Sequence, residues 1–233
     1  VGFDLRASAK RYLRVSCVKR LSRCITWGVL VFMLGGVILA YIQGRSGPPL
    51  QPWHTEQLGA EFTAGKTDEI RTFDDYLRLE DLLSRQLEAQ VYAQTSTGPE
   101  HAIERYSAGS AADPLNHQPN WNRSFELATD APVGGVLLLH GMSDSPYTYR
   151  ALGQALNANG FWVIGLRLPG HGTAPSGLID VSWRDMAAAV QLGMAHLAAK
   201  AGRGSLHIVG YSTGAPLALD FALNALQGDV SPV

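Results

Sequence analysis

Cysteine is nearly absent from this sequence. The 233 residues include only two, Cys17 and Cys24, both close to the N-terminus. A disulfide framework and a cysteine-based metal site are therefore excluded after residue 24, and we expect no metal and no cofactor. With 46% apolar and 17% charged residues, the composition is typical of globular proteins and excludes the collagenous, disordered and disulfide-rich classes.

Basic charge is scarce outside the first residues. Residues 1–24 carry seven Lys or Arg side chains against the single Asp4, so this end is strongly positive. The rest of the chain holds twelve basic and nineteen acidic residues. Because no basic patch remains in the globular part, a nucleic-acid partner is not expected.

Charge of either sign is missing between Arg23 and Arg45. Residues 25–42 read ITWGVLVFMLGGVILAYI, an apolar run close to the length that spans a bilayer. The positive flank lies on its N-terminal side, so the positive-inside rule predicts a cytoplasmic N-terminus and a translocated globular part. A cleaved signal peptide is the alternative, but the run is longer than an ordinary signal sequence and lacks a small-x-small cleavage site.

Residues 43–121 read as a linker followed by a helical leading segment. Residues 44–52 are rich in Gly and Pro, and Thr72 and Asp75 have the spacing of a capping box. Apolar residues then recur at helical spacing as far as Val91, which predicts one amphipathic helix docked on the later domain. Gly65-Lys66-Thr67 resembles the end of a phosphate-binding loop, but it lacks the leading glycine and strand, so nucleotide binding is rejected.

Short apolar runs alternate with helical patterns after residue 130. Residues 136–139, 161–166 and 206–209 are expected to be strands buried on both faces of a parallel sheet. Residues 147–157 and 182–199 are expected to be helices between them, which gives an α/β architecture. In this architecture ligands bind at the carboxyl ends of the strands. On its strand, His207 is expected to be a buried core residue.

The third predicted strand leads into Gly210-Tyr211-Ser212-Thr213-Gly214 and then an apolar helix. This G-x-S-x-G pattern between a strand and a helix predicts a nucleophile elbow with Ser212 as the nucleophile. The backbone N–H of Thr213 and one from the loop after the first strand would then form an oxyanion hole. Met142 is the candidate for that second N–H donor.

Two histidines follow the other strands, His140 after the first and His171 in the turn after the second. Both precede Ser212, whereas an elbow of this kind is followed by its acid and then its histidine. We therefore interpret both as structural residues that hold the adjacent loops.

Together, His140-Gly141, the LPGHGT turn at residues 168–173 and the elbow at residues 210–214 resemble the α/β-hydrolase superfamily. They are most similar to its monoacylglycerol lipase and serine aminopeptidase-like branch. The resemblance covers about residues 122–233. It implies a parallel-sheet core with Ser212 as nucleophile and the N–H groups of Met142 and Thr213 as the oxyanion hole. The expected parts are a basic cytoplasmic tail (1–24), a signal anchor (25–42), the leading segment (43–121) and the N-terminal part of the hydrolase domain (122–233).

Histidine is missing after Ser212. The only later acids are Asp220, inside the elbow helix, and Asp229. A serine without a base is a poor nucleophile. The expectation is therefore that this chain is an N-terminal fragment, inactive by itself, with its core cut after the elbow helix and the triad acid and histidine absent.

These observations lead to the hypothesis of a membrane-anchored serine hydrolase that cleaves small-molecule or lipid carboxylic esters through an acyl-enzyme. A peptidase, an amidase or an acyltransferase of the same fold remains open, because the elbow permits each of them equally. A non-catalytic, hydrolase-like binding module is the alternative of a different class.

Overall fold

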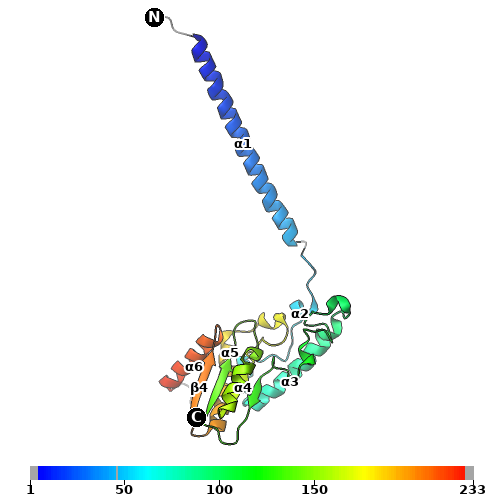
Figure 1. Ribbon diagram of the computed structural model, residues 1–233, viewed down its shortest axis with the longest axis vertical. Helices are drawn as coiled ribbons and strands as arrows, with labels where there is room; N and C mark the ends of the chain where they lie inside the picture. The colour runs from blue at the N-terminus through cyan, green and yellow to red at the C-terminus, as the bar shows by residue number, and fades with distance from the viewer. Residues whose placement is uncertain (1–4, 46, 229–233) are drawn as a thin grey trace. The chain divides into compact units, whose positions relative to one another are not determined.

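The computed structural model describes residues 5–45 and 47–228. The chain divides into two compact units, Val1–Pro49 and Leu50–Val233. In the first unit, α1 (Leu5–Arg45) is one continuous helix of 41 residues (Figure 1). Its segment Ser22–Arg45, which contains an 18-residue window with a mean hydropathy of 2.2, is long and apolar enough to cross a membrane, and it includes the expected residues 25–42.

The second unit is built on a four-stranded sheet with the order β1-β3-β2-β4. Its strands are β1 (Phe125–Leu127), β2 (Gly134–Leu139), β3 (Phe161–Leu166) and β4 (Ser205–Gly210). β2 runs parallel to both β3 and β4, as the sequence predicts, with Leu139 opposite Leu166 on one side and Gly210 on the other. β1 is an additional antiparallel edge strand that pairs with β3.

Helices cover both faces of this sheet. The longer ones are α3 (Phe73–Gln90), α4 (Arg150–Ala158), α5 (Trp183–Ala201) and α6 (Gly214–Gln227), and α2 (Pro52–Thr55) is a single turn. The capping box predicted at Thr72 and Asp75 begins α3, and Ser182 caps α5 in the same way. Short 3-10 turns occur at Ala64–Lys66, Tyr92–Gln94, Pro99–His101, Pro114–Asn116, Pro146–Tyr149 and Pro175–Leu178.

Side chains of β2 alternate between two apolar clusters, as the two-residue period of a strand requires. Leu137 and Leu139 pack in the larger cluster, with residues of α3, α5 and α6. Val136 and Leu138 pack on the opposite face, beside residues of α4. The sheet is therefore the middle of three layers.

The leading segment is part of the main core. Phe62, Phe73, Tyr76 and Leu79 are buried in the same cluster as the β2 and β3 side chains. The backbone N–H of Ala64 also donates to the Asp185 carboxylate at the start of α5, at 2.6 Å. The segment that the sequence predicts to dock on the later domain is thus joined to it by apolar and polar contacts.

One expectation about the sheet is wrong. β2 is buried along its whole length, but residues of β4 alternate between exposed and partly exposed. β4 is less covered because, among the described residues, it pairs only with β2 and forms the edge of the sheet. His207 is consequently exposed rather than a core residue, and its ring accepts or donates a hydrogen bond with Ser205 at 2.9 Å.

Candidate active site

The candidate nucleophile lies in a sharp turn between β4 and α6. Ser212 has a φ of 49°, a left-handed conformation that residues other than glycine rarely adopt. The turn is closed by the N–H of Gly214, which donates to the Tyr211 carbonyl at 2.9 Å. The Ser212 side chain is exposed at the carboxyl end of β4. This strained conformation between a strand and a helix is the one that places an elbow side chain at the top of the sheet.

The glycines on both sides of Ser212 are required by close packing. A Cβ atom on Gly210 would overlap the carbonyl group of Gly214, and one on Gly214 would overlap the carbonyl oxygen of Leu139 at the end of β2. The G-x-S-x-G spacing predicted from the sequence therefore has a steric cause in this fold.

The loop after β2 lies directly against the elbow. A Cβ atom on Gly141 would come within 3.2 Å of the Ser212 Cβ. The Tyr211 hydroxyl donates a hydrogen bond to the Asp144 carboxylate, which ties the loop to the elbow from the other side. Met142, the residue after Gly141, is 53% exposed. The structure thus brings the loop of Met142 and the turn of Ser212 and Thr213 together.

His140 crosslinks two loops and does not face the serine. Its Nε2 accepts the N–H of Leu168 at 3.0 Å, so the proton lies on Nδ1, which donates to the Gly141 carbonyl at 2.9 Å. Burial lowers the pKa of His140 to about 4, so the ring is neutral at physiological pH. With both nitrogens bonded to backbone, His140 holds the loops in place, as its position before Ser212 predicts.

His171 packs edge-on against His140, with the ring centroids 5.0 Å apart. Its Nδ1 is 2.8 Å from the Pro169 carbonyl, and burial lowers its pKa. The turn that carries it is tight: Gly170 and Gly172 have φ values of 76° and 72°. The loops after β2 and β3 are thereby held together.

The remaining histidines are engaged elsewhere or lie on the surface. Within residues 47–228, no hydrogen bond joins the Ser212 hydroxyl to an imidazole or a carboxylate. His117 is exposed. The other histidines have these hydrogen-bonding partners: Gln51 and Trp53 for His54, Glu104 for His101, Glu126 for His196 and Ser205 for His207. Asp220 accepts from the Asn224 amide inside α6 at 3.3 Å. Asp229 lies outside the described residues.

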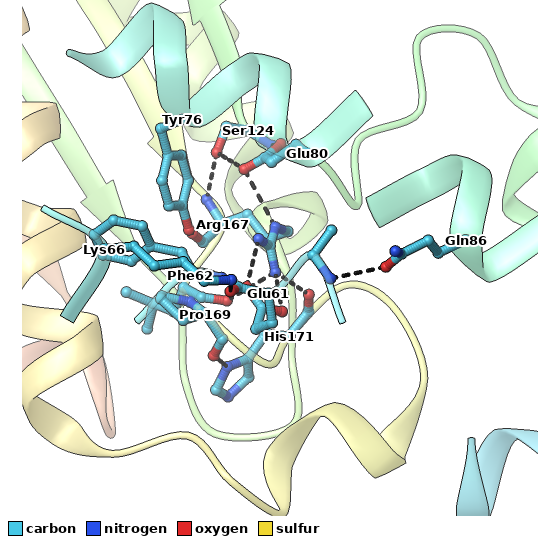
Figure 2. Close-up of polar contacts among 12 residues, drawn as sticks. Glu61, Phe62, Lys66, Tyr76, Glu80, Gln86, Ser124, Arg167, Pro169 and His171 are labelled. Atoms are coloured by element: carbon cyan, nitrogen blue, oxygen red, sulfur yellow. Dashed lines mark hydrogen bonds and ion pairs between the residues drawn. The ribbon is translucent and has the colours of Figure 1, made fainter. Parts of the chain in front are cut away.

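A buried ion cluster supports the loop after β3 and was not found from the sequence (Figure 2). Arg167, the first residue after β3, has a 1% exposed side chain. Its two Nη atoms lie 3.1 and 3.0 Å from the carboxylate oxygens of Glu61, and its Nε lies 3.2 Å from Oε1 of Glu80. Nη1 also donates to the His171 carbonyl at 3.0 Å.

The carboxylates of this cluster come from the leading segment. Glu80, on α3, accepts the N–H and the hydroxyl of Ser124 at 3.0 and 2.6 Å, and the Tyr76 hydroxyl donates to the Arg167 carbonyl at 2.7 Å. For Glu61, burial acts to raise the pKa, but the charge and hydrogen bonds of Arg167 prevail and the net shift is downward. One sequence signal existed, since Glu80 lies at i+4 from Tyr76, on the apolar face of α3.

A pocket of about 330 Å³ opens beside these loops. Ser143 to Ser145, from the loop after β2, form one wall, and residues 170–175 form another. Trp53 and Tyr106, whose rings stack 5.1 Å apart, also line it. Across the described part of the chain, no group of three or more His, Cys, Asp or Glu side chains is arranged to hold a metal ion.

Comparisons with known proteins found similarity over part of the chain. Residues 130–230 match the family described as serine aminopeptidase, S33. A thermostable monoacylglycerol lipase from Bacillus sp. (strain H-257) is 31% identical over 119 residues, which are 51% of this chain and 42% of that protein. A solved structure of a metagenome-derived lipolytic enzyme is 27% identical, with a TM-score of 0.41, over 47% of this chain and 42% of that one.

The chain thus spans less than half the length of each of these relatives. The family match begins before β2 and ends after α6, so it contains both loops described above and the elbow. The motifs that predict the family, His140-Gly141, the turn at residues 168–173 and the elbow, all lie inside it. The family match and the lipase relative therefore support an α/β-hydrolase domain of the serine aminopeptidase and monoacylglycerol lipase branch at residues 130–230.

Proposed function

We propose that this protein is a membrane-anchored serine hydrolase that cleaves carboxylic esters, with Ser212 as its nucleophile. The observation that carries the proposal is the φ of 49° at Ser212, between β4 and α6 and flanked by two glycines that tolerate no side chain. A fold maintains a strained serine at a strand end only when the surrounding contacts determine it, and such strain clusters at active sites.

In the proposed reaction, Ser212 Oγ attacks the ester carbonyl carbon and its proton passes to a general base. The carbonyl oxygen becomes an oxyanion that accepts hydrogen bonds from the N–H groups of Met142 and Thr213. The C–O bond to the alcohol then breaks, the base returns the proton to the alcohol, and an acyl-enzyme remains for hydrolysis by water. The family resemblance assigns the base to a histidine after the elbow helix.

The proposed substrates are esters of lipids or of other small molecules. The relative from Bacillus is a monoacylglycerol lipase, which favours ester over amide substrates for this chain. Exposed apolar side chains at the elbow and on the adjoining loop, Tyr211 and Met142 among them, are suited to contact an acyl chain.

A fluorophosphonate probe, which reacts with activated serines, tests the nucleophile directly. The full-length protein is expected to be labelled and its Ser212→Ala variant is not. Ser205→Ala, which removes an exposed hydroxyl on β4, the strand that leads into the elbow, is the matched control and should be labelled like the wild type. Equal labelling of the Ser212→Ala variant would end the proposal.

We further propose that residues 25–42 anchor the protein, with its N-terminus in the cytoplasm. The apolar part of α1 and the basic residues before it support this orientation. Cys24, exposed and free at the N-terminal end of the apolar run, is a natural reporter. In intact cells a membrane-impermeant maleimide should leave Cys24 unlabelled, and it should label Cys24 once the membrane is permeabilised. Labelling of Cys24 in intact cells would mean that the N-terminus lies outside the cytoplasm.

A further inference from the structure

A second pocket, of about 530 Å³, lies apart from the elbow. It forms where the connection after α3 meets the start of α4. Its walls come from residues 112–122 on one side and from Tyr147 and Arg150 on the other, and Arg105 lies at its rim. Its volume is within the range of about 300–1,000 Å³ that is typical of small-molecule sites.

The lining of this pocket is cationic. Arg105 and Arg150 line it, and no Asp or Glu does. Among the ion pairs of the described residues, none involves Arg105 or Arg150. Arg150 uses one N–H on the Tyr147 carbonyl at 3.0 Å, which leaves other guanidinium donors available. An Arg pair without carboxylates is a favourable environment for an oxyanion.

The carboxylates near the pocket are already occupied. Glu104 pairs with His101 at 2.7 Å, and Asp113 accepts the N–H groups of Gly109 and Leu115, each at 2.9 Å. Asp144 accepts hydrogen bonds from Thr148, Tyr211 and the Ser145 backbone. These groups therefore have hydrogen-bonding partners other than the two arginines.

Amide side chains on the same wall add further donors. The oxygen of Asn122 accepts the Ser145 hydroxyl at 2.6 Å, and that of Asn120 accepts the Asn122 N–H at 3.1 Å. Each of these side chains keeps its NH₂ group for another partner. Asn116 is turned the other way, since its NH₂ donates to Ser110 and its oxygen remains as an acceptor. The pocket thus offers several donors, together with the Asn116 oxygen as an acceptor suited to a hydroxyl group.

Two aromatic rings complete the lining. Trp121 is held edge-on against Phe125, with centroids 4.9 Å apart, and the Arg150 guanidinium lies over the Tyr147 ring at 3.8 Å. Rings of this kind pack against the apolar faces of polyols and sugars, while amides and arginines bind their polar groups. A carbon skeleton that carries an anion could therefore contact the rings as well as the arginines.

We propose that this pocket binds a phosphomonoester carried on a polyol or sugar, with the phosphate on Arg105 and Arg150 and the hydroxyl groups on the asparagines. Ser212 does not line the pocket, so the proposal goes beyond the proposed hydrolysis and stands or falls separately from it.

Isothermal titration calorimetry of the full chain in non-ionic detergent tests this, with glycerol 1-phosphate, inorganic phosphate and glycerol as probes. Glycerol 1-phosphate is expected to bind more tightly than phosphate, and glycerol to give no signal. Arg105→Gln and Arg150→Gln should each weaken binding about 10-fold or more, the loss expected when a charge-assisted hydrogen bond is removed. Arg85→Gln, an exposed arginine of α3 outside the pocket, should bind like the wild type.

Asn120→Asp is a second variant that retains the acceptor used by the Asn122 N–H while placing a negative charge in the lining. It should abolish phosphate binding and keep the melting temperature of the unliganded wild type. Unchanged binding by Arg150→Gln or Asn120→Asp, or no heat with either phosphate compound, would overturn the proposal. Equal affinity for the two phosphates would overturn the assignment of the asparagines and rings to a polyol.

Discussion

The burial of the ion cluster around Arg167 predicts how much stability the substitution Glu80→Gln removes. The Glu80 side chain is 1% exposed, and its carboxylate serves Ser124 and Arg167 at the same time. The glutamine retains one acceptor oxygen for Ser124. Its NH₂ group, however, is a donor: in place of Oε1 it meets the Nε–H of Arg167 and the Ser124 hydroxyl, and in place of Oε2 it meets the Ser124 N–H. In either orientation, the charge that compensates the guanidinium on that side is lost.

Removing one partner of a buried ion pair costs about 3–5 kcal/mol, because the other charge stays buried without compensation. Glu61 still holds Arg167 through two contacts of 3.0 and 3.1 Å, so we place the cost for Glu80→Gln at the lower end, about 3 kcal/mol. For a chain of this size, 1 kcal/mol shifts the melting temperature by roughly 2–4 °C. The expected fall is therefore about 6–12 °C.

Thermal unfolding followed by circular dichroism in non-ionic detergent measures this shift. Glu88→Gln is the matched control, since Glu88 is on the same helix but exposed, and such substitutions change stability by about 0.5 kcal/mol or less. If Glu80→Gln melts at the same temperature as Glu88→Gln, the cluster contributes nothing to stability and the reasoning from burial is refuted.

Three further predictions concern Glu61, His140 and Gly214. The folded-state pKa of Glu61 is lowered below its ordinary 4.5, so its contribution to stability is complete above about pH 4.5 and is lost as the pH falls through the lowered value. Glu61→Gln should therefore flatten the plot of melting temperature against pH between about pH 6 and 3. Parallel plots for the variant and the wild type would contradict this. His140→Ala leaves two buried backbone groups unpaired and should cost about 2 kcal/mol or more in urea unfolding, whereas the exposed His207→Ala should not. Gly214→Ala should destabilise by about 1–3 kcal/mol through overpacking, while Gly59→Ala, where a Cβ meets nothing within 4 Å, should not; similar urea midpoints would remove the steric argument.

Local patterns in the sequence predicted most of the fold. Residues 161–166 form a strand with the predicted bounds, and the Thr72 capping box marks the start of α3. The helix expected from residue 147 begins instead at Arg150, because Pro146–Tyr149 form a 3-10 turn before it. β1 was not predicted, because three residues are too short for a visible alternation of apolar and polar side chains.

Features that depend on contacts between distant parts of the chain could not be predicted as well from the sequence. His207 was expected in the core because β4 reads like a central strand, yet its exposure depends on which segments cover the sheet edge. Glu61 and Arg167 are 106 positions apart, so no local pattern pairs them. For the candidate site, the G-x-S-x-G motif located the turn of Ser212, since that motif is local. The roles of Ser212, Met142 and Thr213 stay predictions.

The ion cluster shows that the folded unit of this chain begins before the segment that matches the family. The family match covers residues 130–230, but the carboxylates that neutralise Arg167 come from Glu61 and Glu80, well before it. Arg167 holds the turn of His171, which packs on His140, whose ring in turn bonds Gly141 beside Ser212. Because a buried guanidinium without its carboxylates is strongly unfavourable, the loops at the elbow require the leading segment. A chain that begins near residue 122 should therefore fail to fold, whereas one that begins at Leu50 retains every contact of this network.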